Sequence, residues 1–509
     1  MNIRRAKEEI KRTVKAYLKK NAFGEYEITS IRQRPILLMG PSGIGKTAVI
    51  EQAARECGVG LVSYTITHHT RQSAVGLPYI KEKVFGGVTH SVTEYTMSEI
   101  IASVYEKMEE TGLSEGILFI DEINCASETL APAMLQFLQC KQFGNQAVPE
   151  GWIIIAAGNP PEYNKSVKEF DVVTLDRVRK IEVEEDLAVW KEYASAQSVA
   201  DCILSYLELR KENFYSFQTD AYGKRFVTAR GWEDLSEMLK VCGELEIPVD
   251  YELIVQYLQD KRIAQDFADY YELYQKYRQT YRVEEILAGR RSDAAVNALS
   301  EAPFDERLSV TGLLLGALHG EFVRYGTKDT LVCGIYEDVK KLKEAIAQGE
   351  AFEEAMRERI QAREDELAIG KKRMHLSRED EQGLQTLLAE LNAMRKEAKL
   401  SGASDSEGCF AAVKCCFEKL TKERESMIEQ TGEKLSSAFA FVLEAFGRGQ
   451  ELVIFLTGLT TDSYAAKYLA ENGSEEYDRY HKELLLHDTQ EELKREIRSF
   501  KEEMECSGR

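Results

Sequence analysis

The chain has 509 residues, of which 44% are hydrophobic and 30% are charged. This length predicts about three domains, and the balance of residues excludes wholesale disorder and a membrane-embedded chain. The formal net charge is −20. It disfavours a nucleic-acid backbone as the main partner, because such binding needs clustered Lys and Arg.

The compartment is indicated by what the sequence lacks. No apolar run approaches the roughly 20 residues that a membrane-spanning helix needs. Arg and Lys punctuate the N-terminal segment, which is atypical of a signal peptide. The ten cysteines include no CxxC pair, which favours reduced thiols. We therefore expect a cytoplasmic protein without a membrane span.

The first predicted element is an amphipathic helix within residues 1–20. Its apolar side chains recur at helical spacing: Ile3, Ala6, Ile10, Val14 and Leu18. Basic residues surround them. We expect this helix to pack on the following domain, and the alternative is a basic arm that binds nucleic acid.

Residues 21–185 are predicted to form an α/β domain with a parallel sheet. Four short apolar runs are typical of strands that are buried on both faces: Ile36–Met39, Leu61–Ile66, Ile117–Ile120 and Trp152–Ala157. Helical segments lie between most of them, as in a P-loop fold. The exception is residues 79–95, where two β-segments around Phe85-Gly86-Gly87 predict a hairpin.

The remainder of the chain is predicted to be helical, with one domain over residues 186–280 and a C-terminal extension over 281–509. The first contains predicted helices at Leu187–Glu208, Ala229–Cys242 and Tyr251–Tyr277. The extension begins with short helices up to residue 330 and continues with long ones at Ile335–Ala368, Ser377–Lys399 and Ala411–Phe446. Residues 1–190 hold 22 basic and 25 acidic side chains, so most of the excess acid lies beyond them.

A phosphate-binding loop follows the first strand and opens the next helix. Its pattern is the Walker A motif, Gly-x-x-x-x-Gly-Lys-Thr. The glycines let backbone N–H groups surround phosphate oxygens, while Lys46 supplies a charge to the β and γ phosphates and Thr47 a hydroxyl to Mg²⁺. The predicted ATP-binding residues are Gly40, Pro41, Ser42, Gly43, Ile44, Gly45, Lys46 and Thr47.

Two adjacent carboxylates, Asp121 and Glu122, follow the strand Ile117–Ile120 and form a Walker B motif. A buried parallel strand delivers such a pair to the carboxyl edge of the sheet, beside the phosphate loop. We expect Asp121 to hold Mg²⁺ together with Thr47, and Glu122 to polarise the attacking water. The pair favours an ATPase that converts ATP and water to ADP and phosphate.

Asn159 stands at the tip of the strand Trp152–Ala157 and precedes a proline. A polar side chain at the tip of the strand next to Walker B can position the hydrolytic water. Asn159 is therefore a predicted catalytic residue, and the alternative is an ordinary Asn-Pro turn.

A Walker A motif, an Asp-Glu Walker B motif and a strand-tip Asn, in this order, resemble AAA+ ATPases. Residues 69–80 (HTRQSAVGLPYI) and 149–160 (PEGWIIIAAGNP) resemble the MoxR family, within the clade that has a β-hairpin inserted in helix two. The resemblance covers roughly residues 20–280. It implies an AAA+ core over 21–185 and a helical lid over 186–280.

The resemblance also implies two catalytic arginines. Leu175–Arg179 looks like the family's Asp/Asn-Arg-Phe segment, so Arg177 is expected to reach the γ-phosphate of a neighbouring subunit. Arg179 is the fallback candidate, and a surface ion pair with an adjacent carboxylate is the structural alternative for Arg177. Val227–Leu235 looks like a sensor 2 segment, so Arg230 is expected to contact the γ-phosphate in cis, or else to be an exposed helix-start arginine.

By resemblance, the protein is expected to be a homo-oligomer, a hexameric ring that remodels or activates a protein client. A von Willebrand A-domain protein is the partner that the family implies. The tip of the hairpin at 79–95 would grip the client in a central pore, or would simply pack. The extension at 281–509 would be a stalk, a docking module or a stiffening bundle. A nucleotide-switched scaffold with little turnover and a nucleic-acid motor remain as other classes.

Overall fold

The computed structural model describes residues 1–143, 146–161, 170–220, 223–290, 293–373, 376–402 and 405–483. The chain forms two compact units. The first consists of residues 1–189, 215–231 and 361–385, and the second of 190–214, 232–360 and the chain from 386 onward.

A five-stranded parallel sheet forms the centre of the first unit, in the order β2-β5-β8-β1-β9. The bounds are β1 Ile36–Met39, β2 Gly60–Thr65, β5 Gly116–Asp121, β8 Trp152–Gly158 and β9 Arg179–Glu182. The first four confirm the predicted strands to within one residue. The edge strand β9 was not predicted, because Ile181 is its only buried side chain. This is the predicted P-loop α/β fold.

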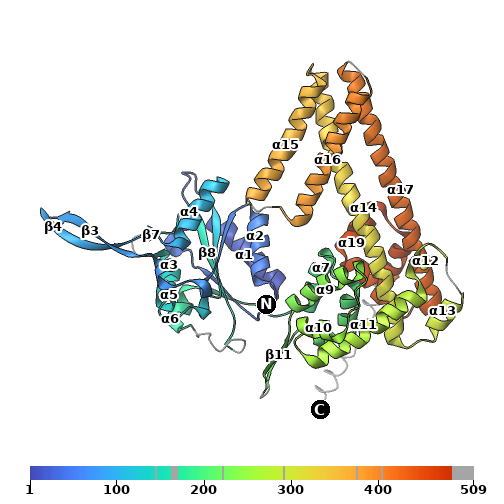
Figure 1. Ribbon diagram of the computed structural model, residues 1–509, viewed down its shortest axis with the longest axis horizontal. Coiled ribbons are helices and arrows are strands. Elements are labelled where there is room, and N and C mark those ends of the chain that lie inside the picture. Colours follow the sequence, from blue (N-terminus) through green and yellow to red (C-terminus); the bar gives the residue numbers. More distant parts are fainter. Residues whose placement is uncertain are drawn as a thin grey trace, which may run out of the picture. The chain divides into compact units, whose positions relative to one another are not determined.

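Helices cover both faces of this sheet (Figure 1). Helices α1 (Ile3–Tyr17) and α2 (Lys46–Cys57) share one core with alternate residues of β8, namely Ile153, Ile155 and Ala157. Helices α4 (Glu99–Thr111) and α5 (Ala131–Cys140) share the other core with Trp152, Ile154 and Ala156. Strand β8 is therefore apolar throughout because both of its faces are buried. Shorter elements of this unit are α3 (Arg71–Val75), α6 (Val172–Arg177), β6 (Gln142–Phe143) and β7 (Gln146–Ala147).

Helix α1 packs on the α/β unit as its apolar spacing predicts. Ala6, Ile10 and Val14 are buried in the core that α2 also covers. Glu56 of α2 pairs with two basic side chains of α1, Lys7 at 2.9 Å and Lys11 at 2.6 Å. Part of the basic charge of α1 is thus used inside the unit, which favours packing over a nucleic-acid arm.

The predicted hairpin is present as β3 (Pro78–Phe85) and β4 (Val88–Tyr95), which pair antiparallel around two glycines with φ of +59° and +85°. It projects from the first unit (Figure 1), and nearly all of its side chains are exposed. Near the tip, Val84 is 66%, Phe85 57% and Val88 59% exposed. Within the single chain, the hairpin thus holds apolar side chains in solvent, and its contact with a client stays a prediction.

The stretch that was predicted to be helical over residues 186–280 is interrupted three times. The predicted helix Leu187–Glu208 is two helices, α7 (Leu187–Ala196) and α8 (Asp201–Leu209), because the chain turns at Ser198 with φ of +52°. The predicted helix Tyr251–Tyr277 is also two. Its second part begins anew where the Asp260 carboxylate accepts hydrogen bonds from the backbone N–H groups of Arg262 and Ile263. The two are α10 (Tyr251–Tyr257) and α11 (Lys261–Tyr281).

The third interruption is an antiparallel pair, β10 (Ser216–Asp220) and β11 (Gly223–Val227). It belongs to the first unit. Helix α9 (Ala229–Glu244) begins directly after it. The pair lies in residues 209–228, which the predicted helices left unassigned within a region expected to be helical.

The C-terminal extension is helical, with different bounds from those predicted. Two short helices lie between residues 283 and 300, as expected, but the rest of the region expected to hold short helices, together with the start of Ile335–Ala368, is a single 44-residue helix, α14. It ends before Gly349, whose φ of +93° breaks the helix. Within the described residues, no helix is long and apolar enough to cross a membrane. The helices are α12 (Val283–Leu287), α13 (Asp293–Ser300), α14 (Phe304–Ala347), α15 (Phe352–Arg373), α16 (Arg378–Leu400), α17 (Ser406–Phe446), α18 (Gln450–Thr461) and α19 (Ser463–Asn472).

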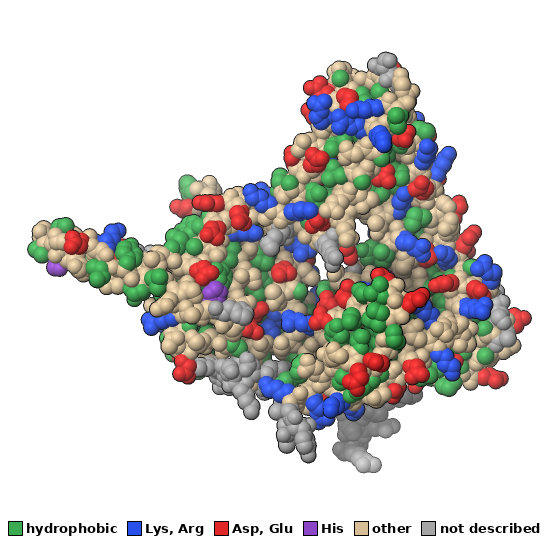
Figure 2. Space-filling model, viewed as in Figure 1, with side chains coloured by type: hydrophobic (Ala, Val, Ile, Leu, Met, Phe, Trp, Pro, Cys, Tyr) green, Lys and Arg blue, Asp and Glu red, His purple; other side chains and the backbone are tan. Residues whose placement is uncertain are grey.

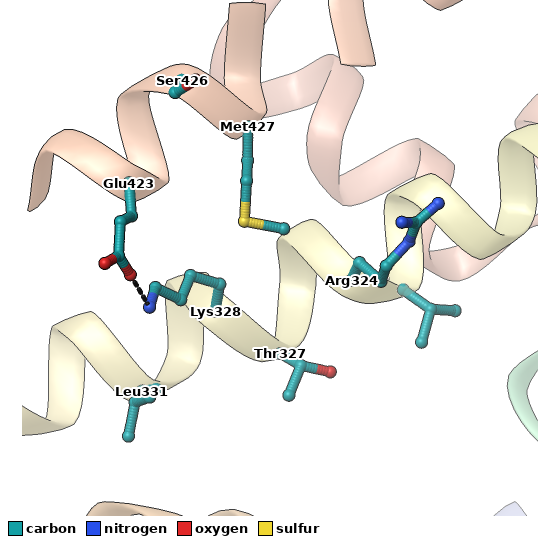
Figure 3. A pocket seen from close by; sticks show the side chains of 8 residues that line it. Arg324, Thr327, Lys328, Leu331, Glu423, Ser426 and Met427 are labelled. Atoms are coloured by element: carbon teal, nitrogen blue, oxygen red, sulfur yellow. Dashed lines mark hydrogen bonds and ion pairs between the residues drawn. The ribbon is translucent and has the colours of Figure 1, made fainter. Parts of the chain in front are cut away.

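A groove of about 590 Å³ lies between α14 and α17 in the second unit (Figure 3). Val323, Leu331 and Met427 supply much of its wall. Its charged side chains are already paired: Lys328 with Glu423 at 2.5 Å, and Arg324 with Glu321. The groove therefore presents no free charge to a ligand.

Candidate active site

The strands that carry the three motifs are neighbours in the sheet, in the order β5-β8-β1. Because these strands are parallel, their carboxyl ends lie at one edge. Asp121 ends β5, Asn159 follows β8, and the phosphate loop follows β1. The fold therefore brings together residues that lie more than 100 positions apart in the sequence.

The phosphate loop depends on its glycines. Gly43 and Gly45 have φ of +77° and +89°, a region that residues with a Cβ rarely adopt. A Cβ on Gly43 would also lie 2.9 Å from Cβ of Thr228. Helix α2 begins at Lys46, so the loop leads into a helix N-terminus, where N–H groups and the helix dipole favour anions.

Lys46 is buried in this loop, and its ammonium group has three acceptors. Nζ donates to Gly40 O at 2.8 Å, Pro41 O at 2.7 Å and Asn159 Oδ1 at 2.9 Å. Burial lowers the pKa of Lys46 to about 8, with Asp121 opposing the shift and Arg230 adding to it. A phosphate bound here would place a negative charge beside Lys46 and so stabilise its ammonium form.

Thr47 and Asp121 form a pair of oxygen donors that fits Mg²⁺. The Thr47 hydroxyl donates to Asp121 Oδ2 at 2.9 Å, and the other carboxylate oxygen accepts from the N–H of Glu122 at 2.9 Å. Hydroxyl and carboxylate oxygens are the ligands that this hard cation prefers. These two residues would hold the ion, which would neutralise charge on the phosphate oxygens of a nucleotide.

Glu122 is half-buried at the end of β5 and has a left-handed backbone, with φ of +55°. Its Oε2 accepts a hydrogen bond of 3.0 Å from the Thr67 hydroxyl. Thr67 lies just beyond β2, the strand that pairs with β5. The sequence motifs did not indicate Thr67; only its place after a strand that neighbours Walker B could have done so.

A second residue that the motifs missed is Asn124, which bonds to the backbone of Asn159 through its side-chain amide. It stands three positions after Asp121. This spacing was available in the sequence, but only the pairing of β5 with β8 gives it meaning.

The two candidate arginines for trans action have different partners in the structure. Arg177 ends α6, is exposed, and donates to Gln139 Oε1 of α5 rather than to an adjacent carboxylate. Arg179 donates to Thr13 Oγ1 at 2.5 Å and to Glu9 Oε2 at 2.7 Å, both on α1. Both arginines are exposed, and they differ in that Arg179 pairs with a carboxylate of its own chain whereas the partner of Arg177 is a neutral amide.

Arg230 lies beside the phosphate loop, because the segment that follows β10 and β11 packs there. Its backbone N–H donates to Gly43 O at 3.2 Å. The Thr228 hydroxyl accepts from the N–H of Gly231 at 3.1 Å and so caps α9. The Tyr215 hydroxyl donates to Ser42 O at 3.1 Å. The start of α9 is therefore anchored directly to the loop that would hold the phosphates.

Comparison with protein families agrees with the fold and with the phosphate loop described above. Residues 35–178 match the family model of the AAA domain, dynein-related subfamily. This part of the chain has the AAA+ P-loop fold. The matched range contains the phosphate loop, Asp121, Glu122, Asn159 and Arg177. A comparison of the chain with curated proteins found no match.

Proposed function

We propose that this protein is an ATPase of the MoxR type, which hydrolyses ATP to ADP and phosphate and uses the energy to remodel or activate a protein client. The observation that carries the proposal is the meeting of Lys46, Thr47, Asp121 and Glu122 at one edge of the sheet. A loop for phosphates and two adjacent carboxylates are the parts that this reaction requires.

In the proposed reaction, a water molecule attacks the γ-phosphorus and Glu122 accepts its proton. Lys46 stabilises the negative charge on the phosphate oxygens. Asn159 orients the water, and its amide oxygen is already within 2.9 Å of the Lys46 ammonium. Arg230 contacts the γ-phosphate in cis, and its place at the start of α9 links that helix to the nucleotide state.

The proposal includes a homo-oligomeric ring of about six subunits. Arg177 is exposed and lies on the helix that follows Asn159 along the chain. Acting on the nucleotide of a neighbouring subunit, it would neutralise charge that develops in the transition state. A site completed by the next subunit would make hydrolysis dependent on assembly.

The β3–β4 hairpin supports a protein client. Its apolar side chains stand in solvent (Figure 2), and such exposure is typical of a surface that meets another polypeptide. Residues 69–80 and 149–160 carry the MoxR resemblance, from which we propose a von Willebrand A-domain protein as partner. In this proposal the tip around Phe85 contacts the client.

The proposed hydrolysis is tested with Glu122→Gln, which keeps the size of the side chain and removes its basicity. We expect phosphate release to fall by at least about 100-fold while ATP binding persists. Glu82→Gln, at an exposed position of β3, is the matched control and should hydrolyse normally. Normal turnover by Glu122→Gln would refute the proposed reaction.

One observation favours a second candidate, a nucleotide-switched scaffold with little turnover. The hydrogen bond from Thr67 occupies one oxygen of the Glu122 carboxylate, which would have to be free to accept a proton from water. A scaffold would bind ATP stoichiometrically and release no phosphate in the steady state. A phosphate-release assay on the assembled wild type distinguishes the two.

A further inference from the structure

The side-chain amide of Asn124 links the ends of β5 and β8 with two hydrogen bonds, as a backbone amide does between paired strands. It is 5% exposed and lies just after β5. Its Nδ2 donates to Asn159 O at 2.7 Å, and its Oδ1 accepts from Asn159 N at 3.3 Å. The last registered pair between β5 and β8 is Ile120 with Ala156. The Asn124 amide therefore continues the pairing of these strands beyond that point.

Gly158 makes this contact possible. A Cβ at Gly158 would lie 2.7 Å from Oδ1 of Asn124, closer than real Cβ atoms approach an oxygen. The glycine before Asn159 is thus required for the side chain of Asn124 to reach the backbone. Gly158 leaves the space that Asn124 needs, and Asn124 in turn holds the backbone of Asn159.

The held backbone determines where the Asn159 side chain lies. Its Oδ1 accepts from Lys46 Nζ at 2.9 Å, so the amide faces the phosphate loop. A strand tip that was free to rotate would lose this direction, because side-chain orientation follows the backbone. A buried amide that makes two bonds to one residue provides such a restraint.

We propose that Asn124 is a positioning residue for ATP hydrolysis, which clamps Asn159 so that its amide faces the γ-phosphate and the attacking water. This inference rests on the proposed function. It assigns to Asn124 no contact with nucleotide. Its effect on the reaction passes through Asn159 alone.

The test is a double-mutant cycle with Asn124→Ala and Asn159→Ala, measured as kcat and KM of the assembled protein. We expect Asn124→Ala to lower kcat by about tenfold with KM nearly unchanged. In the Asn159→Ala background the same substitution should change kcat less than twofold. An equal loss in both backgrounds would mean that Asn124 acts on the fold rather than through Asn159, and would overturn the proposal.

Two further variants separate positioning from stability. Gly158→Ala should reproduce the loss of kcat, because it displaces an intact Asn124. Asn213→Ala removes another buried asparagine, whose amide bonds to Tyr206 and Asp266, and should lower the melting temperature without lowering kcat. A normal kcat in Gly158→Ala would contradict the proposal.

Failure of the Asn124 proposal can be distinguished from failure of the proposed ATPase function. A wild type without turnover would refute the proposed function. The cycle would then be measured by the rise in melting temperature that ADP, Mg²⁺ and aluminium fluoride cause together, because this complex mimics the transition state rather than bound ATP. The proposal expects that Asn124→Ala reduces this rise only when Asn159 is present. Additive reductions would overturn it.

Discussion

The Thr67 hydroxyl donates a 3.0 Å hydrogen bond to Oε2 of Glu122, the residue that we propose as the base for hydrolysis. This bond occupies a carboxylate oxygen that would otherwise be available to accept a proton from the attacking water. Thr67→Val removes the donor and keeps the shape. We expect basal kcat to rise by up to about tenfold, with KM unchanged, in a steady-state phosphate assay.

Thr67→Ser is the control for this prediction, because it retains the hydroxyl. It should behave like the wild type. A fall in kcat on Thr67→Val would mean that the bond orients Glu122 for its task rather than restraining it.

The two arginines near the end of α6 should differ in the property that they affect. Arg177→Ala should lower kcat by about 10³-fold, because an arginine that acts in trans has an effect of this size. Arg179→Ala should leave kcat nearly unchanged and lower the free energy of unfolding by roughly 1 kcal/mol, through loss of its bonds to Thr13 and Glu9.

Mixing experiments check that Arg177 acts in trans. Arg177→Ala subunits retain an intact phosphate loop, and Lys46→Ala subunits retain Arg177. A mixture of the two should recover part of the activity that each lacks. A mixture that stays inactive although the subunits assemble together would count against the shared site.

The depressed pKa of Lys46 predicts proton uptake on nucleotide binding. Its value of about 8 in the free protein leaves the side chain largely neutral at pH 9. Bound phosphates favour the ammonium form and raise this pKa, so ATP binding should take up nearly one proton at pH 9 and far less at pH 7. Calorimetry in buffers of different ionisation enthalpy measures this number.

Lys46→Arg provides the control, because a guanidinium stays charged at both pH values. Its binding should show no pH-dependent uptake from this position. Equal proton uptake at pH 7 and pH 9 in the wild type would contradict a shifted Lys46.

The phosphate loop should not tolerate a side chain at Gly43. Gly43→Ala combines a φ of +77° with a Cβ only 2.9 Å from Thr228. We expect ATP affinity to fall by at least about tenfold, as measured by equilibrium binding. Gly24→Ala is the matched control, because Gly24 has a φ of +83° and no atom within 4 Å of the added Cβ.

The hairpin tip should affect binding of a protein client and leave the stability of the fold unchanged. Phe85→Ser removes an apolar side chain that is 57% exposed, so the melting temperature and basal kcat should stay unchanged. If the tip contacts clients, an unfolded protein such as casein should stimulate wild-type turnover and fail to stimulate the variant. Phe137→Ser, at a fully buried position, should instead unfold the domain.

Much of the site could be predicted because its chemistry is local in sequence. The glycines, Lys46 and Thr47 lie within eight consecutive positions, and Asp121 and Glu122 are adjacent. The strands that carry them are continuous apolar runs, since both faces of the sheet are buried. Such patterns can be read without knowledge of the partners.

The bounds of several helices could not be predicted in the same way. Helix α14 continues for 44 residues through a region expected to hold short helices, and β10 with β11 interrupts a stretch expected to be helical. Composition favours helix along α14, whereas residues 209–228 held no predicted helix. Neither the turn at Ser198 nor the pairing of β10 with β11 leaves a strong local pattern.

The sequence by itself determined that this chain has a phosphate loop, a pair of carboxylates and a strand-tip asparagine, because each depends on residues that are neighbours in the chain. Only the tertiary structure decided that Thr67 meets Glu122, that Asn124 holds Asn159, and that Arg179 bonds to α1 while Arg177 bonds to α5. These contacts join strands and helices that are distant in sequence, and side-chain hydrogen bonds of this kind are set by packing rather than by any local pattern.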